Sequence, residues 1–229
     1  MRTTLSLRDF AVPLSLAAVG ALGALPGSRG GPDPVALLAW LALLAAPAGF
    51  ACGNFGARHW ALSAIPPAAW MGLLAIVDGL SARDLPSPTW AALAWTGLYA
   101  AGYGAGRLAP RAGFSGVGAL FLAGALLAAL PILPGFLGAP LPPKIAAQLL
   151  DLSPATLLAE SAGLDWMRHP AIYAPAGAAD IDPATRVAYR GALAGPLAFV
   201  VGCALAVLGE GIARARARNP TPEAASTGS

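Results

Sequence analysis

Six apolar runs divide this sequence, and their length constrains the fold more than any other feature. A transmembrane helix needs about 20 mostly apolar residues, with a range of about 17–25. We therefore predict an all-α fold, a polytopic membrane helix bundle of about six transmembrane helices in which residues 1–229 form a single transmembrane domain. The predicted spans cover about 10–25, 35–51, 60–78, 90–106, 113–133 and 191–208.

The charge content agrees with a membrane protein. Only 11% of the residues are charged and 57% are hydrophobic, whereas a soluble domain carries about 25% charged residues. A surface with so few charges cannot be hydrated over its whole area. The 13 arginines are scattered in short loops and do not gather on one face, so we expect membrane lipids as partners and no nucleic acid.

Arginines in the short loops predict the orientation, because cytoplasmic loops carry an excess of positive charge. If the N-terminus is inside, the two short outer loops hold only Arg29 and Arg83. The inner segments then hold Arg2, Arg8, Arg58, Arg107, Arg111, Arg214, Arg216 and Arg218. We expect a multi-pass protein of the cell (inner) membrane with both termini cytoplasmic. The alternative is that residues 1–25 resemble a signal peptide, whose cleavage would leave five spans.

The longest segment between runs covers residues 134–190 and is predicted to be extracytoplasmic and partly helical. Ser153 followed by Pro154 is typical of a helix N-cap and first helical position, and Gly163 of a helix end. We expect a short helix over 154–162. Residues 219–229, rich in Pro, Ala, Ser and Thr, are predicted to be a disordered tail.

The densest polar cluster lies in the same segment and is the candidate functional cluster. It consists of Glu160, Asp165, Trp166, Arg168 and His169. A metal site normally needs more than one histidine or cysteine, so we predict no metal and no cofactor. The cluster is either a structural or lipid-headgroup feature, or a ligand-contact or catalytic site.

Two adjacent prolines, Pro66 and Pro67, interrupt the third run and are the candidate helix hinge. Proline removes a backbone donor and clashes with the preceding turn. Neighbouring helices can absorb such a kink, or the broken helix can line a cavity as it does in transporters. The sequence leaves both alternatives open.

A partial nucleophile motif lies at the start of the fifth run. Gly113-Phe114-Ser115-Gly116 resembles the Gly-x-Ser-Gly of rhomboid intramembrane proteases. A serine nucleophile needs a base within hydrogen-bond reach, and the resemblance implies a histidine on the last core span. Residues 191–208 contain no histidine, so we assign no catalytic role to Ser115.

A second partial motif follows the third run. Residues 78–83 resemble the first half of the CDP-alcohol phosphatidyltransferase signature, whose carboxylates hold metal ions. The second half implies Gly, Asp and Asp where this chain has Ala92, Thr96 and Ala100. We therefore predict no catalytic residues here either.

The overall plan resembles permease subunits of ABC transporters in the type-2 exporter class. Those have six spans, both termini inside and their largest outer segment, often with short re-entrant helices, between spans five and six. The resemblance implies an exporter working with a separate ATP-binding subunit, since the chain lacks a Gly-x-x-x-x-Gly-Lys-Ser/Thr motif.

Two alternatives stay open beside the permease. One is a non-catalytic scaffold or assembly factor that binds a partner through its outer segment, as a homo- or hetero-oligomer. The other is a membrane-embedded enzyme that uses Glu160, Asp165 and His169. The missing catalytic partners favour a protein that is not an enzyme.

Overall fold

The computed structural model describes residues 7–22, 34–55, 60–78, 88–110, 112–129, 152–162 and 191–218, together with positions 142, 145 and 148. Across these residues the regular structure is helical and contains no strand, which confirms the all-α prediction. The elements are α1 (Leu7–Ala21), α2 (Pro34–Phe55), the 3₁₀ helix η2 (Trp60–Ala64), α3 (Ile65–Asp78), α4 (Pro88–Leu108), α5 (Gly113–Ala129), α8 (Pro154–Ser161) and α9 (Gly191–Arg218).

The helices follow the predicted runs but differ at their ends. The helix α9 continues ten residues past the apolar run, from Leu208 to Arg218, because alanine, glutamate and arginine are good helix formers in water as well as in lipid. The predicted third span is divided between η2 and α3 at Ala64 and Ile65.

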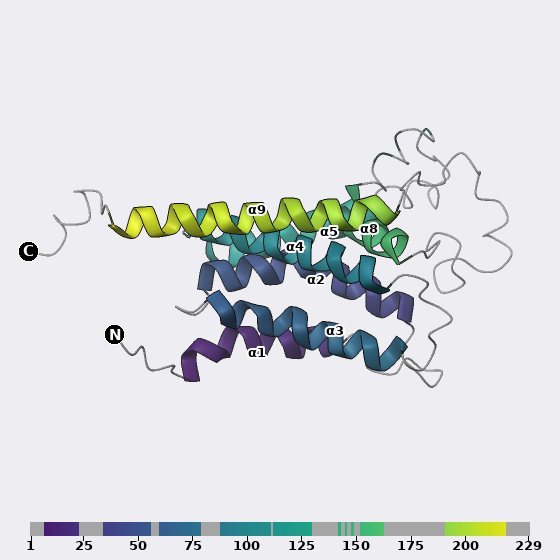
Figure 1. Ribbon diagram of the computed structural model, residues 1–229, viewed down its shortest axis with the longest axis horizontal. Coiled ribbons are helices and arrows are strands. Elements are labelled where there is room, and N and C mark those ends of the chain that lie inside the picture. The colour runs from purple at the N-terminus through teal and green to yellow at the C-terminus, as the bar shows by residue number, and fades with distance from the viewer. Residues whose placement is uncertain are drawn as a thin grey trace, which may run out of the picture.

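The long helices lie side by side along the longest axis of the molecule (Figure 1). α1 begins and α9 ends at the same end, whereas α8 lies at the opposite end. α4 and α9 run in the same direction, because their contacts advance together along each helix: Trp90 faces Gly195, Gly97 faces Gly202, and Gly104 faces Gly209. α2 runs in that direction too, since Ala46 lies against Gly102 and Phe50 against Gly106. We call the end where α4 and α9 finish the basic end. It carries Arg107, Arg214, Arg216 and Arg218.

Glycines let α4 pack backbone against backbone on the α9 side. A Cβ atom at Gly202 would collide with the carbonyl oxygen of Gly97, and one at Gly209 would come 2.5 Å from the carbonyl oxygen of Gly104. The seven-residue spacing is close to two helical turns, so the glycines share one face. Small residues of this kind allow helices to approach closely in membranes.

A second glycine face joins α4 to α2. Gly102 packs against the backbone of Ala46, and Gly106 against that of Phe50. These two glycines form a small-xxx-small pair, and the close approach that such spacing predicts is present. α4 is therefore held on two sides at backbone distance.

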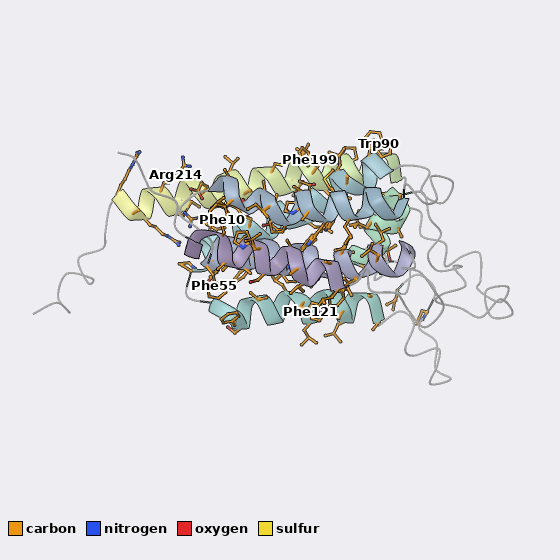
Figure 2. The ribbon with its side chains drawn as sticks, turned by 90° about the horizontal axis from the view of Figure 1, so that it is seen from below. Phe10, Phe55, Trp90, Phe121, Phe199 and Arg214 are labelled. Atoms are coloured by element: carbon orange, nitrogen blue, oxygen red, sulfur yellow. The ribbon has the colours of Figure 1, made fainter. Side chains whose placement is uncertain are left out.

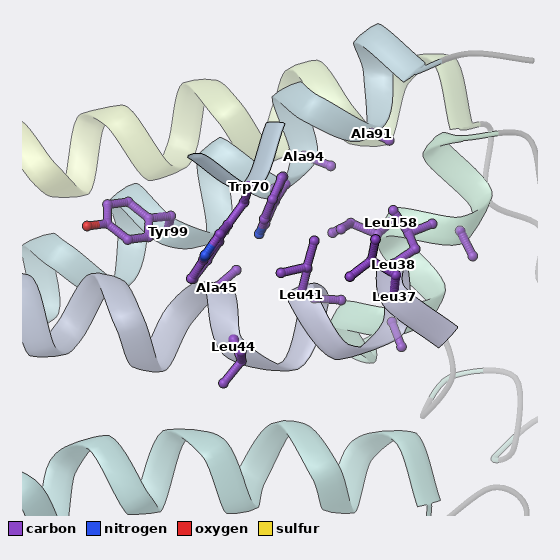
Figure 3. Close-up of a cluster of buried hydrophobic side chains, with 14 of the residues drawn as sticks. Leu37, Leu38, Leu41, Leu44, Ala45, Trp70, Ala91, Ala94, Tyr99 and Leu158 are labelled. Atoms are coloured by element: carbon purple, nitrogen blue, oxygen red, sulfur yellow. The ribbon is translucent and has the colours of Figure 1, made fainter. Parts of the chain in front are cut away.

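Trp70 of α3 contacts both α1 and α4, and Figure 3 shows its ring near Tyr99 in the cluster of buried side chains. Its ring stacks on Trp95 of α4 with the centroids 5.2 Å apart, and it meets the ring of Tyr99 edge-on at 6.3 Å. The backbone of Gly20 in α1 lies against the edge of the indole that carries Nε1. One buried side chain thus contacts α1 and α4 from its position on α3.

The short helix α8 is inserted into the end of the bundle opposite the basic end. Leu158 is fully buried in the core with Leu37 and Leu38 of α2, and Ser161 lies beside Gly195 of α9. The helix confirms the sequence prediction. Ser153 occupies the predicted N-cap position, because its carbonyl accepts the first helical hydrogen bond, from the backbone N–H of Leu157. Its buried hydroxyl has no hydrogen-bond partner among the described residues.

The outward faces of the bundle are apolar (Figure 2). Two helices, Leu37–Phe55 and Leu193–Arg218, are long and apolar enough to cross a bilayer, and three shorter apolar helices accompany them among the described residues. The first of the two is mostly covered by its neighbours, whereas the second is mostly uncovered. The large exposed apolar side chains of α9 are Leu193, Leu197, Val200, Val201, Leu205, Val207 and Leu208.

Candidate functional site

Most of the predicted polar cluster falls outside the described residues. This is so for Asp165, Trp166, Arg168 and His169. Glu160 belongs to α8, but its side chain is not among those described. The cluster, and the enzyme hypothesis that depends on it, therefore stay predictions.

The predicted hinge falls where the helix type changes. Pro66 and Pro67 occupy the first turn of α3, directly after η2 ends at Ala64. Proline is tolerated in a first turn because the backbone donor that it lacks would have no partner there. The prolines start an α-helix here and do not break one, and movement about them stays a prediction.

Ser115 is used locally at the start of α5. Its exposed hydroxyl donates a hydrogen bond of 2.5 Å to the carbonyl of Ala112, which is a helix-start contact. Among the described residues, no group of three His, Cys, Asp or Glu side chains could hold a metal ion.

The structure instead assembles a polar network at the basic end, around the carboxylate of Glu210. The guanidinium Nε of Arg107 lies 2.9 Å from Glu210 Oε2, and the hydroxyl of Tyr103 donates to the same oxygen at 3.1 Å. The other oxygen accepts a bond of 3.2 Å from Arg214 Nε. One carboxylate thus accepts hydrogen bonds from three side chains on two helices.

The register of α4 and α9 explains why these groups meet. The contact between Gly104 and Gly209 fixes the two helices at this level. Tyr103 and Arg107, one turn apart on α4, therefore lie opposite Glu210 on α9. Arg214 follows Glu210 by one turn on the same helix, at the spacing where oppositely charged side chains interact.

Glu210 lies beyond Leu208, where the apolar stretch of α9 ends, and it is ionised at neutral pH. Partial burial alone would raise its pKa, but the positive charge of Arg107 and the bonds from Tyr103 and Arg214 outweigh burial and lower the pKa of the carboxyl below its ordinary value. The side chains of Arg107 and Glu210 are 31% and 21% exposed, so the pair is only partly screened by solvent.

Two further bonds satisfy backbone carbonyls at the end of α4. The guanidinium of Arg216 donates to the carbonyl of Leu108 at 3.1 Å, and the side-chain amide of Asn54 donates to that of Ala109 at 2.7 Å. Helix C-termini leave carbonyls without intrahelical partners. These bonds fasten the ends of α2 and α9 to α4.

The network continues a stripe along α4 whose members are four residues apart. The stripe consists of Trp95, Tyr99, Tyr103 and Arg107. Its buried end carries the indole N–H of Trp95, which has no hydrogen-bond partner among the described residues, and the phenol of Tyr99, which lies beside the thiol of Cys52. The i, i+4 spacing was visible in the sequence, but only the position of α9 shows that the stripe ends at a carboxylate.

The fold and the site together define a class: an all-helical bundle held by glycine contacts, with an apolar outer surface and an arginine–carboxylate network at one end. Comparisons with protein-family models, curated proteins and solved structures found no match for the chain.

Proposed function

We propose that the protein is a multi-pass integral membrane protein of the cell's inner membrane, with α1, α2, η2–α3, α4, α5 and α9 as six spans. The uncovered apolar face of α9 carries this proposal. Leu193, Leu197, Val200 and Val207 are each more than 60% exposed. A contiguous patch of this kind is rare on soluble monomers, whereas lipid tails solvate it without penalty.

The helix directions support the six-span topology. α2, α4 and α9 run in the same direction, as the second, fourth and sixth spans of one chain must. α1 begins at the basic end and α9 finishes there (Figure 1). The arginines of that end favour the cytoplasmic side, which gives both termini the same location.

Within this class, we propose that the chain is the permease subunit of an ABC-type exporter that works with a separate ATPase. The support is α8, which lies between the fifth and sixth spans in the sequence and inserts into the bundle end opposite the basic end. The two ends of such a short helix leave backbone groups without intrahelical partners, and these are tolerated at membrane depth only where protein or water surrounds them.

A second candidate is a non-catalytic scaffold or assembly factor. The backbone contacts of α4 with both α2 and α9 favour it, because such packing holds three spans as one rigid unit. A scaffold needs this rigidity, whereas a permease must move some helices against others.

Two experiments test these proposals separately. Reporter fusions at Ala178 and after Arg218 should report outside and inside respectively, and any other pattern would overturn the topology. Affinity purification of the full chain from native membranes should recover an ATP-binding protein in stoichiometric amount. A stable complex containing only proteins without ATPase activity would exclude the permease and favour the scaffold.

A further inference from the structure

The basic end holds more positive charge than its own carboxylate neutralises. On α4 and α9, four arginines face one acidic side chain, Glu210, which leaves an excess of three positive charges. Arg107 is the partner closest to the carboxylate. Arg214 also pairs with it, but the Arg214 side chain remains 62% exposed.

These charges are presented by a fixed element. α9 is helical up to Arg218, and the bond from Arg216 to the carbonyl of Leu108 fastens this part of α9 to α4. The arginines thus extend from the bundle on a rigid helix.

An exposed apolar stripe leads directly to this cationic group. Leu193, Val200 and Val207 are spaced by seven residues on α9 and are 67%, 63% and 73% exposed. Arg214 follows Val207 by seven residues, so it continues the same face. Arg214 lies six residues beyond Leu208, which is about 9 Å of helix. The polar layer of a bilayer is about 5–7 Å thick on each side, so the backbone of Arg214 lies at its outer edge, from which the long side chain extends back to the phosphates.

We propose that the basic end binds the headgroups of anionic phospholipids, with the acyl chains along Val207 and Val200 and the phosphate at Arg214 and Arg218, which lie one turn apart on the same side of α9. This proposal rests on the membrane insertion proposed above. The continuity of apolar stripe and arginine fits an amphiphile, which has both parts, better than it fits an acidic protein surface, which has only the charge. Arginines near a membrane surface each attract anionic lipid.

The test is lipid analysis of the full-length protein, purified in a mild non-ionic detergent from membranes that contain zwitterionic and anionic phospholipids. Mass spectrometry of the retained lipid should show enrichment of the anionic class over its membrane proportion. The variant R214Q/R218Q should lower that enrichment at least fivefold, which is about the effect of one arginine at the surface. The variant R186Q/R190Q, with the same change of net charge elsewhere in the sequence, should keep it.

Each other outcome decides against the proposal. Equal enrichment in both double variants would overturn it, as would loss of the anionic lipid on adding millimolar inorganic phosphate, which would indicate a site for free phosphate. Loss of a co-purifying protein with unchanged lipid would make the surface a protein-docking site. If the double variant fails to accumulate, R218Q alone should lower the enrichment, because Arg218 forms no ion pair or hydrogen bond among the described residues. Alkaline extraction tests membrane insertion independently. If the wild-type protein stays in the membrane, a negative lipid result counts against the headgroup site and not against the membrane proposal.

Discussion

Gly202 of α9 lies directly against the carbonyl oxygen of Gly97 of α4, so closely that a methyl group at Gly202 would overlap that oxygen. The two helices can adopt their observed register only if both positions lack a side chain. The positions of Glu210 and Arg107 depend on that register, so the polar network depends on glycines two turns or more away.

Gly202→Ala should destabilise the protein. The methyl group must displace backbone, and overpacking of this kind costs about 1–3 kcal/mol. At Gly211 on the same helix, the place that an added methyl group would occupy has no neighbouring atoms within 4 Å. Gly211→Ala should therefore be neutral or slightly stabilising, since alanine favours helix more than glycine. Thermal unfolding in detergent, followed by tryptophan fluorescence, measures both. Equal melting temperatures for the two variants would contradict the backbone packing of α4 on α9.

The Arg107–Glu210 pair should show an energetic coupling of about 1–2 kcal/mol, between the values for exposed pairs and those for charged hydrogen bonds that are shielded from water. A double-mutant cycle with Arg107→Ala, Glu210→Ala and the double variant isolates this coupling. Tyr103→Phe, which removes one hydrogen bond to the same oxygen, should have a smaller effect. Additive effects of the two alanine substitutions would mean that the pair makes no contribution to stability.

The stability of the protein should depend on pH through Glu210. Because its pKa is lower in the folded protein than the ordinary value of 4.5, the folded state binds fewer protons than the unfolded state between the two values. The stabilisation is therefore fully present above the ordinary pKa and is lost as pH falls through the folded value. Melting temperatures between pH 7 and pH 3 should fall at the acid end by less in Glu210→Gln than in wild type. Parallel curves would show that other groups cause the acid loss.

Trp70→Ala should loosen the attachment of α1 and α3 to the bundle. Trp70 is 1% exposed and contacts Gly20, Trp95 and Tyr99, and truncation of a buried tryptophan costs about 3–5 kcal/mol. The neighbouring Met71 is 43% exposed, so Met71→Ala is the matched control and should change little. Limited proteolysis and thermal unfolding of the two variants provide the measurement. Equal resistance of the two variants to protease would mean that contacts other than those of Trp70 hold α1 and α3 to the bundle.

Much of the fold was predictable because the relevant physics is local. Each apolar run is long enough to form a helix by itself, and the Ser153–Pro154 pair predicts the start of α8 without reference to any other segment. The spacing of Gly102 and Gly106 indicates close helix packing, although it does not say which helix is approached. In the structure, both glycines approach the backbone of α2.

The candidate site was harder to predict, because it depends on residues far apart in the sequence. The sequence predicted a functional cluster at Glu160 and its neighbours, because several polar residues lie close together there. The network that the structure shows joins Tyr103 and Arg107 to Glu210, more than a hundred residues later. Nothing in the local pattern around Glu210 distinguishes it from an ordinary acidic residue at the end of a helix.

The sequence by itself determined the helical class, the approximate helix positions and the apolar outer surface, since each follows from the hydrophobicity and helix-forming tendency of neighbouring residues. Only the tertiary structure decided that α4 packs against both α2 and α9 and that α8 is buried. It also decided that Glu210 pairs with Arg107. The physical reason is that glycine carries no side chain and therefore permits many close approaches, and only the packing of the whole chain selects Gly97 against Gly202 among them.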